Sequence, residues 1–344
     1  MAPPLRALLL ALTALAPACN RVQPPPQGPE AAVGPSTHTA DPPGRFPAFP
    51  AQPRAMASAA FHARWSDGNA ELTSYDVITP RYGEPRPAEL VLIYVTEPMN
   101  RRTWIKDDDA RGPDRVAVLK LNVSLKFETG VYPYSVMTSV FAPLDAWRPA
   151  RFAPVKITLT AQEWCGHVFQ ALWPGEDSVR TEIRSYFASE GERDETLPTR
   201  PGTLYEDALL IQLRELDGPF AEGGLWEGDL VPSLWRTRRA HTDGRPVPAR
   251  IARSQATVEG EAVHRFVLES GSYRRTIDVE SGGAHQVIGW ESSEGERVRR
   301  RRSARLPYWQ LNREADRVPT RERLGLDTRA RPSAVAAPPG TAGR

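Results

Sequence analysis

The C-terminal third of the chain alternates strand-like segments with very short glycine-bearing turns, and this pattern restricts the possible folds more than any other feature. The segments are 249–258, 262–269, 272–280, 285–292 and 297–306. The turns between them are Glu259-Gly260-Glu261, Ser270-Gly271, Ser281-Gly282-Gly283 and Ser293-Glu294-Gly295. Turns this short join only antiparallel neighbours, because a parallel pair needs a crossover of about a dozen residues or more. The pattern therefore predicts an antiparallel meander in this region.

Further strands are predicted earlier in the chain. Between Leu119 and Phe127, every second residue is apolar and the residues between are polar, which is typical of a strand with one buried face. Val155 to Leu159 repeats this alternation. The run 89–96 is apolar on both faces, which favours a central position in a sheet, and 71–79 reads as a strand that Pro80 ends.

One helix is predicted between these two groups of strands. Thr203-Leu204-Tyr205-Glu206 matches a capping box, with apolar residues at helical spacing after it and Asp217-Gly218-Pro219 as the stop. The expected fold is mainly β: an antiparallel curved sheet or open half-barrel with one principal α-helix. This element order resembles the β-clam shape of periplasmic lipid-handling lipoproteins.

The N-terminus predicts export. Arg6 is followed by an apolar run over 7–15, which is far too short to span a bilayer and fits a secretory signal peptide. The small residues Ala16 and Ala18 then lead to Cys19, and the arrangement resembles a bacterial lipoprotein signal. That resemblance implies a signal peptide over 1–18 and lipid modification of Cys19; Asn20 is consistent with the outer membrane. The alternative is an ordinary signal peptide and plain secretion.

The predicted domain organisation follows from composition. Much of the chain's 34 prolines lies near the two ends. We expect a Pro-rich tether over 19–57, a β-rich globular domain over 58–316 and a disordered tail over 317–344. With a net charge of +2, no strong field attracts nucleic acid. The run Arg299 to Arg302 is interpreted as a solvated edge strand; contact with anionic lipid is the alternative.

One short segment combines residue types that carry chemistry. Gln162-Glu163-Trp164-Cys165-Gly166-His167 follows the strand at Val155. If the strand continues, Glu163, Cys165 and His167 share a face, and a thiol with an imidazole and an orienting carboxylate is what a thiolate nucleophile needs. The same residues could begin a metal site, but no further ligand pair is present, so no metal or cofactor is predicted. The competing interpretation is a structural cysteine. The acidic loop 190–195 is interpreted as a solvated turn.

Several blocks resemble a group of uncharacterised bacterial lipoproteins between about Trp65 and Leu311. The blocks are Trp65 to Glu71, Pro80-Arg81-Tyr82-Gly83-Glu84, Gln162 to His167, Gly202 to Asp207 and Arg305-Leu306-Pro307-Tyr308-Trp309. Members are often labelled "septum formation inhibitor Maf", which implies nucleotide pyrophosphatase activity. The Ser-x-Ser-Pro-Arg-Arg loop of true Maf enzymes is absent, and Thr79-Pro80-Arg81 is the nearest string.

These observations favour an exported, lipid-anchored protein of the cell envelope, facing the periplasm or the cell surface. We expect a non-catalytic role, in which the curved sheet binds an apolar or lipid-like ligand or an envelope partner protein. A thiol-based enzyme that uses Cys165 and His167 is the first alternative. A Maf-type pyrophosphatase is the second.

Overall fold

The structure, a computed structural model, describes Phe46, 49–50, 52–109 and 111–328, all within one unit that spans Asp41–Arg344. The predicted signal peptide, Cys19 and most of the predicted tether lie outside the described residues, as does the end of the predicted tail.

Sixteen strands form one sheet in the described part of the chain. They are β1 Ala70–Arg81, β2 Glu84–Asn100, β3 Ile105–Lys106, β4 Arg115–Thr129, β5 Tyr132–Pro143, β6 Lys156–Glu163, β7 Gly166–Pro174, β8 Ser178–Ser185, β9 Glu192–Pro198, β10 Leu204–Tyr205, β11 Leu225–Val231, β12 Val247–Val258, β13 Glu261–Ser270, β14 Tyr273–Glu280, β15 Val287–Ser292 and β16 Arg297–Leu306. The helices are α1 Ala59–Trp65, α2 Leu209–Gln212, α3 Leu234–Ala240 and α4 Glu314–Arg323, with 3₁₀ turns η1 Gly112–Asp114, η2 Glu206–Ala208, η3 Glu222–Gly224 and η4 Tyr308–Gln310.

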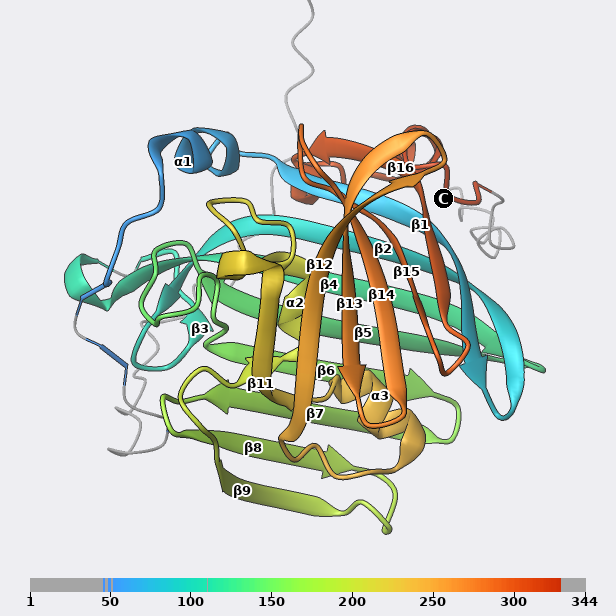
Figure 1. Cartoon of the computed structure of the whole chain (residues 1–344). Coiled ribbons are helices and arrows are strands. Elements are labelled where there is room, and N and C mark those ends of the chain that lie inside the picture. Colours follow the sequence, from blue (N-terminus) through green and yellow to red (C-terminus); the bar gives the residue numbers. More distant parts are fainter. Residues whose placement is uncertain (1–45, 47–48, 51, 110, 329–344) are drawn as a thin grey trace, which may run out of the picture. The chain divides into compact units, whose positions relative to one another are not determined.

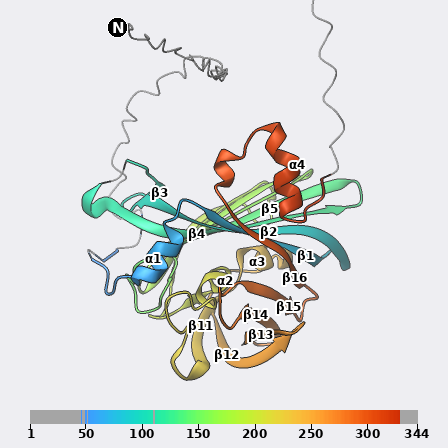
Figure 2. The ribbon, with the colours of Figure 1, turned by 90° about the horizontal axis from the view of Figure 1, so that it is seen from above.

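The sheet order joins the two groups of strands that the sequence predicts. It runs β10-β11-β12-β13-β14-β15-β16-β1-β2-β4-β5-β6-β7-β8-β9, with β3 beside β2. Only the short β10–β11 pair is parallel. The sheet is strongly curved and stays open, so β11 to β15 lie across from β4 to β8, with α2 and α3 between these two arms (Figure 1, Figure 2). The predicted antiparallel, curved and open β fold is confirmed.

The space between the arms is filled by side chains. One cluster of buried residues includes Leu121 and Ile157 from the first arm, Phe266 and Ile277 from the second, and Ile211 from α2. All five are fully buried. The helix therefore serves as the centre of the core, and the concave face of the sheet is not an empty groove.

The helix itself differs from the prediction. Only Leu209–Gln212 is α-helical, because Leu204–Tyr205 form strand β10 and Glu215 has a positive φ of 51°. The capping box does not form. The Thr203 hydroxyl donates to the Arg200 carbonyl, and the Glu206 carboxylate accepts from Tyr273 and from the Ser233 backbone instead. Distant partners thus outweigh a local capping signal.

The N-terminal boundary of the domain also moves. Phe49, which the prediction places in the tether, contacts Trp104 and Trp147, with ring centroids 4.7 and 4.8 Å away. Ala55 forms a β-bridge with Ala146. The last part of the predicted tether therefore packs on the folded unit and belongs to it.

The predicted tail is folded over its first part. Helix α4 occupies residues 314–323, and Leu324 is buried with Leu72 and Val91 on the convex face of the sheet. The Ser74 hydroxyl donates to the Leu324 carbonyl. This cover explains why β2 is apolar on both faces, which confirms its predicted central position.

The arginine-rich strand β16 is not an edge strand, as the sequence interpretation had it. It pairs with β1 on one side and with β15 on the other. Carboxylates of other strands of the sheet meet its arginines: Arg300 pairs with Glu261 on β13 and Glu280 on β14, and Arg301 pairs with Asp76 on β1. Most of its positive charge is therefore neutralised within the sheet.

Candidate functional site

The segment with Cys165 is a hairpin turn and not a continuous strand. Strand β6 ends at Glu163 and β7 begins at Gly166, so Trp164 and Cys165 form a two-residue connection. Glu163 pairs with Gly166, and Gln162 pairs with His167. Because neighbouring residues of a strand point to opposite faces, Glu163 is buried on one face while His167 is exposed on the other. The structure does not bring the three predicted residues together.

The chemistry of Cys165 is also unlike that of a nucleophile. The side chain is exposed. The Glu163 carboxylate accepts a hydrogen bond from the thiol, and this raises the pKa of Cys165, whereas a thiolate nucleophile needs a lowered pKa. Glu163 also accepts from the backbone N–H of Cys165 at 2.9 Å, which is a turn-stabilising role. The thiol-enzyme prediction stays untested, and this geometry offers it no support.

A pocket of about 480 Å³ lies between β7 to β9 and helix α3 with the loop that follows it. Its apolar wall consists of Ala171, Leu172, Ile183, Leu197 and Leu234. The same lining also carries the charged or polar residues Glu190, Arg193, Arg238, His241 and Asp243. A hollow of this size with apolar and polar walls is typical of a small-molecule site.

The charged wall is built around Glu190, which the sequence interpretation had placed in a solvated turn. Its carboxylate lies 2.8 Å from the guanidinium of Arg238 and 2.9 Å from Nδ1 of His241. The Arg238 side chain is buried, and its guanidinium lies over the ring of Phe187. His241 ends α3 in the left-handed region with φ 53°, which turns its ring back toward Glu190. The arrangement fixes α3 to the β8–β9 turn and leaves polar groups along the pocket rim.

A second carboxylate on the pocket rim, that of Asp243, lies near two arginine side chains. Asp243 lies 4.0 Å from Arg193 and 3.7 Å from Arg245. Nε of Arg238 is buried and has no hydrogen-bond partner among the described residues. The basic side chains that the rim leaves accessible include Arg193 and His241, which are 44% and 56% exposed.

The N-terminus of α3 is held by two adjacent carboxylates. Glu206 accepts from the backbone N–H of Ser233 at 3.0 Å, and Asp207 accepts from that of Leu234 at 2.9 Å. Burial would raise the pKa of Glu206, but Arg275 and Arg236 outweigh it, so the pKa of Glu206 lies below its ordinary value. Burial raises the pKa of Asp207 to about 6. The free volume beside this pair is about 60 Å³, which is room for little more than water.

Two more open hollows lie along α3. One, of about 490 Å³, is lined by Arg236, Tyr273 and Glu294, and the other, of about 210 Å³, by Tyr82, Arg239 and Glu294. Arg239 and Glu294 form an ion pair at 2.7 Å between them. The pocket and the hollow of about 490 Å³ share Thr237, Thr242 and Asp243 as lining residues, so they adjoin along α3 and the loop after it.

The described residues are not arranged as nucleotide or metal chemistry would require. Thr79-Pro80-Arg81 lies within β1 and forms no loop. In the described ranges, no group of three or more His, Cys, Asp or Glu side chains is placed to hold a metal ion. None of the described helices has the length and apolar character that crossing a bilayer requires. The pyrophosphatase prediction gains nothing from these observations.

Comparison with protein families, with characterised proteins and with solved structures found no match to this chain.

Sequence reasoning missed the pocket because its parts are far apart in the chain. Residues 170–172 meet 234–245 only through the curvature of the sheet. One local signal was available in the sequence Leu234-Trp235-Arg236-Thr237-Arg238-Arg239. It places two large apolar residues beside three arginines in one short helix. An arginine-rich helix that begins with two buried-type residues indicates internal ion pairs.

Proposed function

We propose that this protein is an exported, lipid-anchored binding protein of the cell envelope, and that the pocket beside α3 takes a small amphipathic ligand. The observation that carries the proposal is the pairing of an apolar wall with a charged rim in one hollow of about 480 Å³. Buried side chains fill most of the interior between the arms, and this pocket lies at the β7 to β9 end of the same concave face. The absence of a nucleophile–base pair at Cys165 favours binding over catalysis.

The walls indicate the ligand's chemistry. Ile183 and Leu197 would contact an apolar body, such as an acyl chain or a ring system, because burying that surface removes it from water. The guanidinium of Arg193, whose side chain is 44% exposed on the rim, would meet a polar or anionic head. A lipid-like molecule has both parts.

Ligand binding is tested with the probe anilinonaphthalene sulfonate, which combines aromatic rings with an anionic head, and with dodecanoate as competitor. We expect the probe to bind the wild-type protein with enhanced fluorescence and dodecanoate to displace it. Ile183 is half-buried on the pocket wall, so Ile183→Trp fills the hollow and is expected to weaken probe binding about tenfold or more. Ile105→Trp is the matched control, because Ile105 is exposed on β3 and distant from the pocket in the sheet. Equal probe binding by wild type and Ile183→Trp would overturn the pocket assignment.

Anchoring is tested separately in the native host. The wild type is expected to fractionate with membranes and to carry an added acyl mass on Cys19, and Cys19→Ala is expected to be soluble without that mass. Intact mass spectrometry of both fractions checks this. A wild-type protein that is soluble and begins at or after Cys19 would indicate plain secretion, and an uncleaved cytoplasmic chain would contradict export altogether.

A further inference from the structure

Four hairpin ends form a row of exposed aromatic and aliphatic residues along one end of the sheet. The hairpins β1–β2, β4–β5, β6–β7 and β8–β9 are consecutive in the sheet order, so their turns lie side by side (Figure 1). Their tips carry Tyr82, Val131, Trp164 and Tyr186, whose exposed fractions are 57, 78, 68 and 73%. Adjacent tips are two strands apart, which is about 10 Å. We call these four residues the hairpin row.

Local contacts hold the row in place. The ring of Trp164 stacks on Tyr132, with centroids 6.1 Å apart and planes at 29°. The Tyr186 ring lies against Gly166 so closely that a Cβ there would be 2.5 Å from it. The Tyr82 hydroxyl bonds to that of Tyr134 at 2.7 Å. Large apolar groups are therefore kept exposed by specific packing, which single mobile surface side chains do not show.

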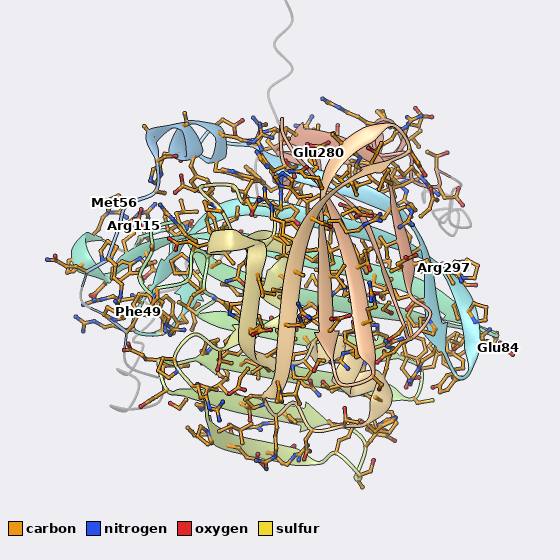
Figure 3. All side chains as sticks on the ribbon, viewed as in Figure 1. Phe49, Met56, Glu84, Arg115, Glu280 and Arg297 are labelled. Atoms are coloured by element: carbon orange, nitrogen blue, oxygen red, sulfur yellow. The ribbon has the colours of Figure 1, made fainter. Side chains whose placement is uncertain are left out.

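The tips of the hairpin row carry little formal charge, whereas the opposite ends of the same strands carry several charged residues. The tip residues Tyr82-Gly83, Gly130-Val131 and Trp164-Cys165 are uncharged, and the charged residue of the β8–β9 turn 186–191 is Glu190, which is paired with Arg238. At the other end, the β2–β4 connection holds Asp107 to Asp109 and the β7–β8 turn holds Glu176-Asp177. In Figure 3, Glu84 marks the end with the row and Arg115 marks the opposite end. Polarity is thus divided along the strand direction.

We propose that the hairpin row inserts into the interfacial layer of a lipid bilayer. Tryptophan and tyrosine have an apolar body with a polar end and are favoured at that depth, and the exposed Val131 adds an aliphatic side chain at a tip. Separate protruding tips suit a fluid surface better than a flat protein partner. The ring of charge behind the tips is balanced, with Arg86 and Lys126 against Glu84 and Glu128. The surface therefore suits zwitterionic headgroups and does not depend on anionic lipid.

The row also borders the hollows around α3. Tyr82 and Gly83 line the hollow with Arg239, and Ser189 and Glu190, in the same turn as Tyr186, line the pocket of the proposed function. Docking by the row would bring both openings to the lipid surface. The inference stands on the row itself and does not require that the pocket bind a ligand.

The test uses the predicted mature chain without Cys19, residues 20–344, so that neither an acyl anchor nor the apolar segment 7–15 contributes, and vesicles of phosphatidylcholine and phosphatidylethanolamine. We expect co-sedimentation with vesicles that persists from low to high salt, because the contact is apolar. Val131→Ser combined with Trp164→Ser is expected to lower the partition coefficient about tenfold or more. Both residues are exposed, so the variant keeps its fold, and thermal unfolding checks this. The matched control is Ile105→Ser, an exposed aliphatic outside the row, which is expected to bind vesicles like the parent.

Three outcomes would overturn the inference. One is no vesicle binding by the parent chain. Another is vesicle binding that the double variant leaves unchanged or that high salt abolishes, which would assign the contact to charged residues elsewhere. The third is a shift of the monomer–dimer equilibrium by the double variant in analytical ultracentrifugation without vesicle binding, which would make the row a contact between copies of this chain. None of these outcomes bears on probe binding at Ile183, so the two proposals fail independently.

Discussion

Replacement of Glu71 by glutamine is expected to lower the free energy of unfolding by about 3 to 4 kcal/mol, because it leaves the guanidinium of Arg214 buried without its counter-charge. The side chains of Glu71 and Arg214 are 1% and 0% exposed, and their charged atoms approach to 2.8 Å. That approach is an ion pair without the alignment of a hydrogen bond. Urea denaturation at neutral pH measures the effect.

Arg214 contacts several parts of the chain that are distant in sequence, so leaving its charge without a partner would be costly. It follows α2, it pairs with Glu71 on β1, and it donates to the carbonyls of Ala284 and His285 at 3.0 and 2.8 Å. Its guanidinium also lies 4.3 Å from the ring centroid of Tyr94. Burial would lower the pKa of Arg214, but Glu71 and the nearby tyrosines raise it above its ordinary value, so the residue stays charged in the core.

The control for this prediction is Arg64→Gln. Arg64 lies 3.4 Å from the other carboxylate oxygen of Glu71 but is 39% exposed, so its loss is expected to cost less than about 1 kcal/mol. In the double variant Glu71→Leu with Arg214→Met, the total cost should fall below the sum of the two single changes, since no isolated charge remains. Strict additivity, or a Glu71→Gln variant as stable as wild type, would contradict the assignment of a coupled buried pair.

The strands were predictable because their signals are local. Alternation between Leu119 and Phe127 and the turns at Gly260 and Gly271 depend on residues within one or two positions of each other. The five C-terminal segments and their connections match β12 to β16 within a few residues. A hydrophobic pattern of period two with short turns leaves few alternatives to an antiparallel meander.

The errors arise where partners far apart in sequence decide the outcome. Glu206 has the right spacing for a capping box, yet Arg275, on β14, reaches it only in the folded chain. Strand β16 reads as an edge because its partner β1 is more than two hundred residues earlier. Cys165 was placed in a strand because nothing in its neighbours except Gly166 indicates a turn. The site was missed for the same reason, since the pocket exists only where β7 to β9 meet α3.

At the base of α3, the largest effects on stability are expected from Glu206 and Asp207. The contributions of these two neighbouring carboxylates depend on pH in opposite directions. Glu206→Gln is expected to cost about 3 to 4 kcal/mol at neutral pH, because it leaves the buried Arg275 and the nearby Arg236 without their carboxylate. The pKa of Glu206 is lowered in the folded state, so its contribution is present above the unfolded pKa of about 4 and is lost as the pH falls. The cost of Glu206→Gln should therefore shrink in acid.

Asp207→Asn is expected to act in the opposite sense. Burial raises the pKa of Asp207 to about 6, so the folded state favours its protonated form, and stability from this group is lost as the pH rises from about 4 to about 6. An asparagine oxygen can still accept from the Leu234 N–H without carrying charge. Relative to wild type, the free energy of unfolding of Asp207→Asn should rise by about 2 kcal/mol between pH 4 and pH 7.5. This value is smaller than the full pKa shift of Asp207 implies, because part of the side chain remains accessible to solvent.

Unfolding of both variants from about pH 2.5 to about pH 7.5 separates electrostatics from packing, because the Glu206 effect changes below about pH 4 and the Asp207 effect changes between about pH 4 and about pH 6. If α3 is held only by shape, the two substitutions, each nearly isosteric, should change stability by similar small amounts at every pH. If the carboxylates act as the structure places them, the stability differences of the two variants from wild type should have opposite slopes with pH. Probe binding at Ile183 measured in parallel would show whether loosening the base of α3 reaches the pocket wall, because Leu234 donates its backbone N–H to the Asp207 carboxylate and lines the pocket with its side chain.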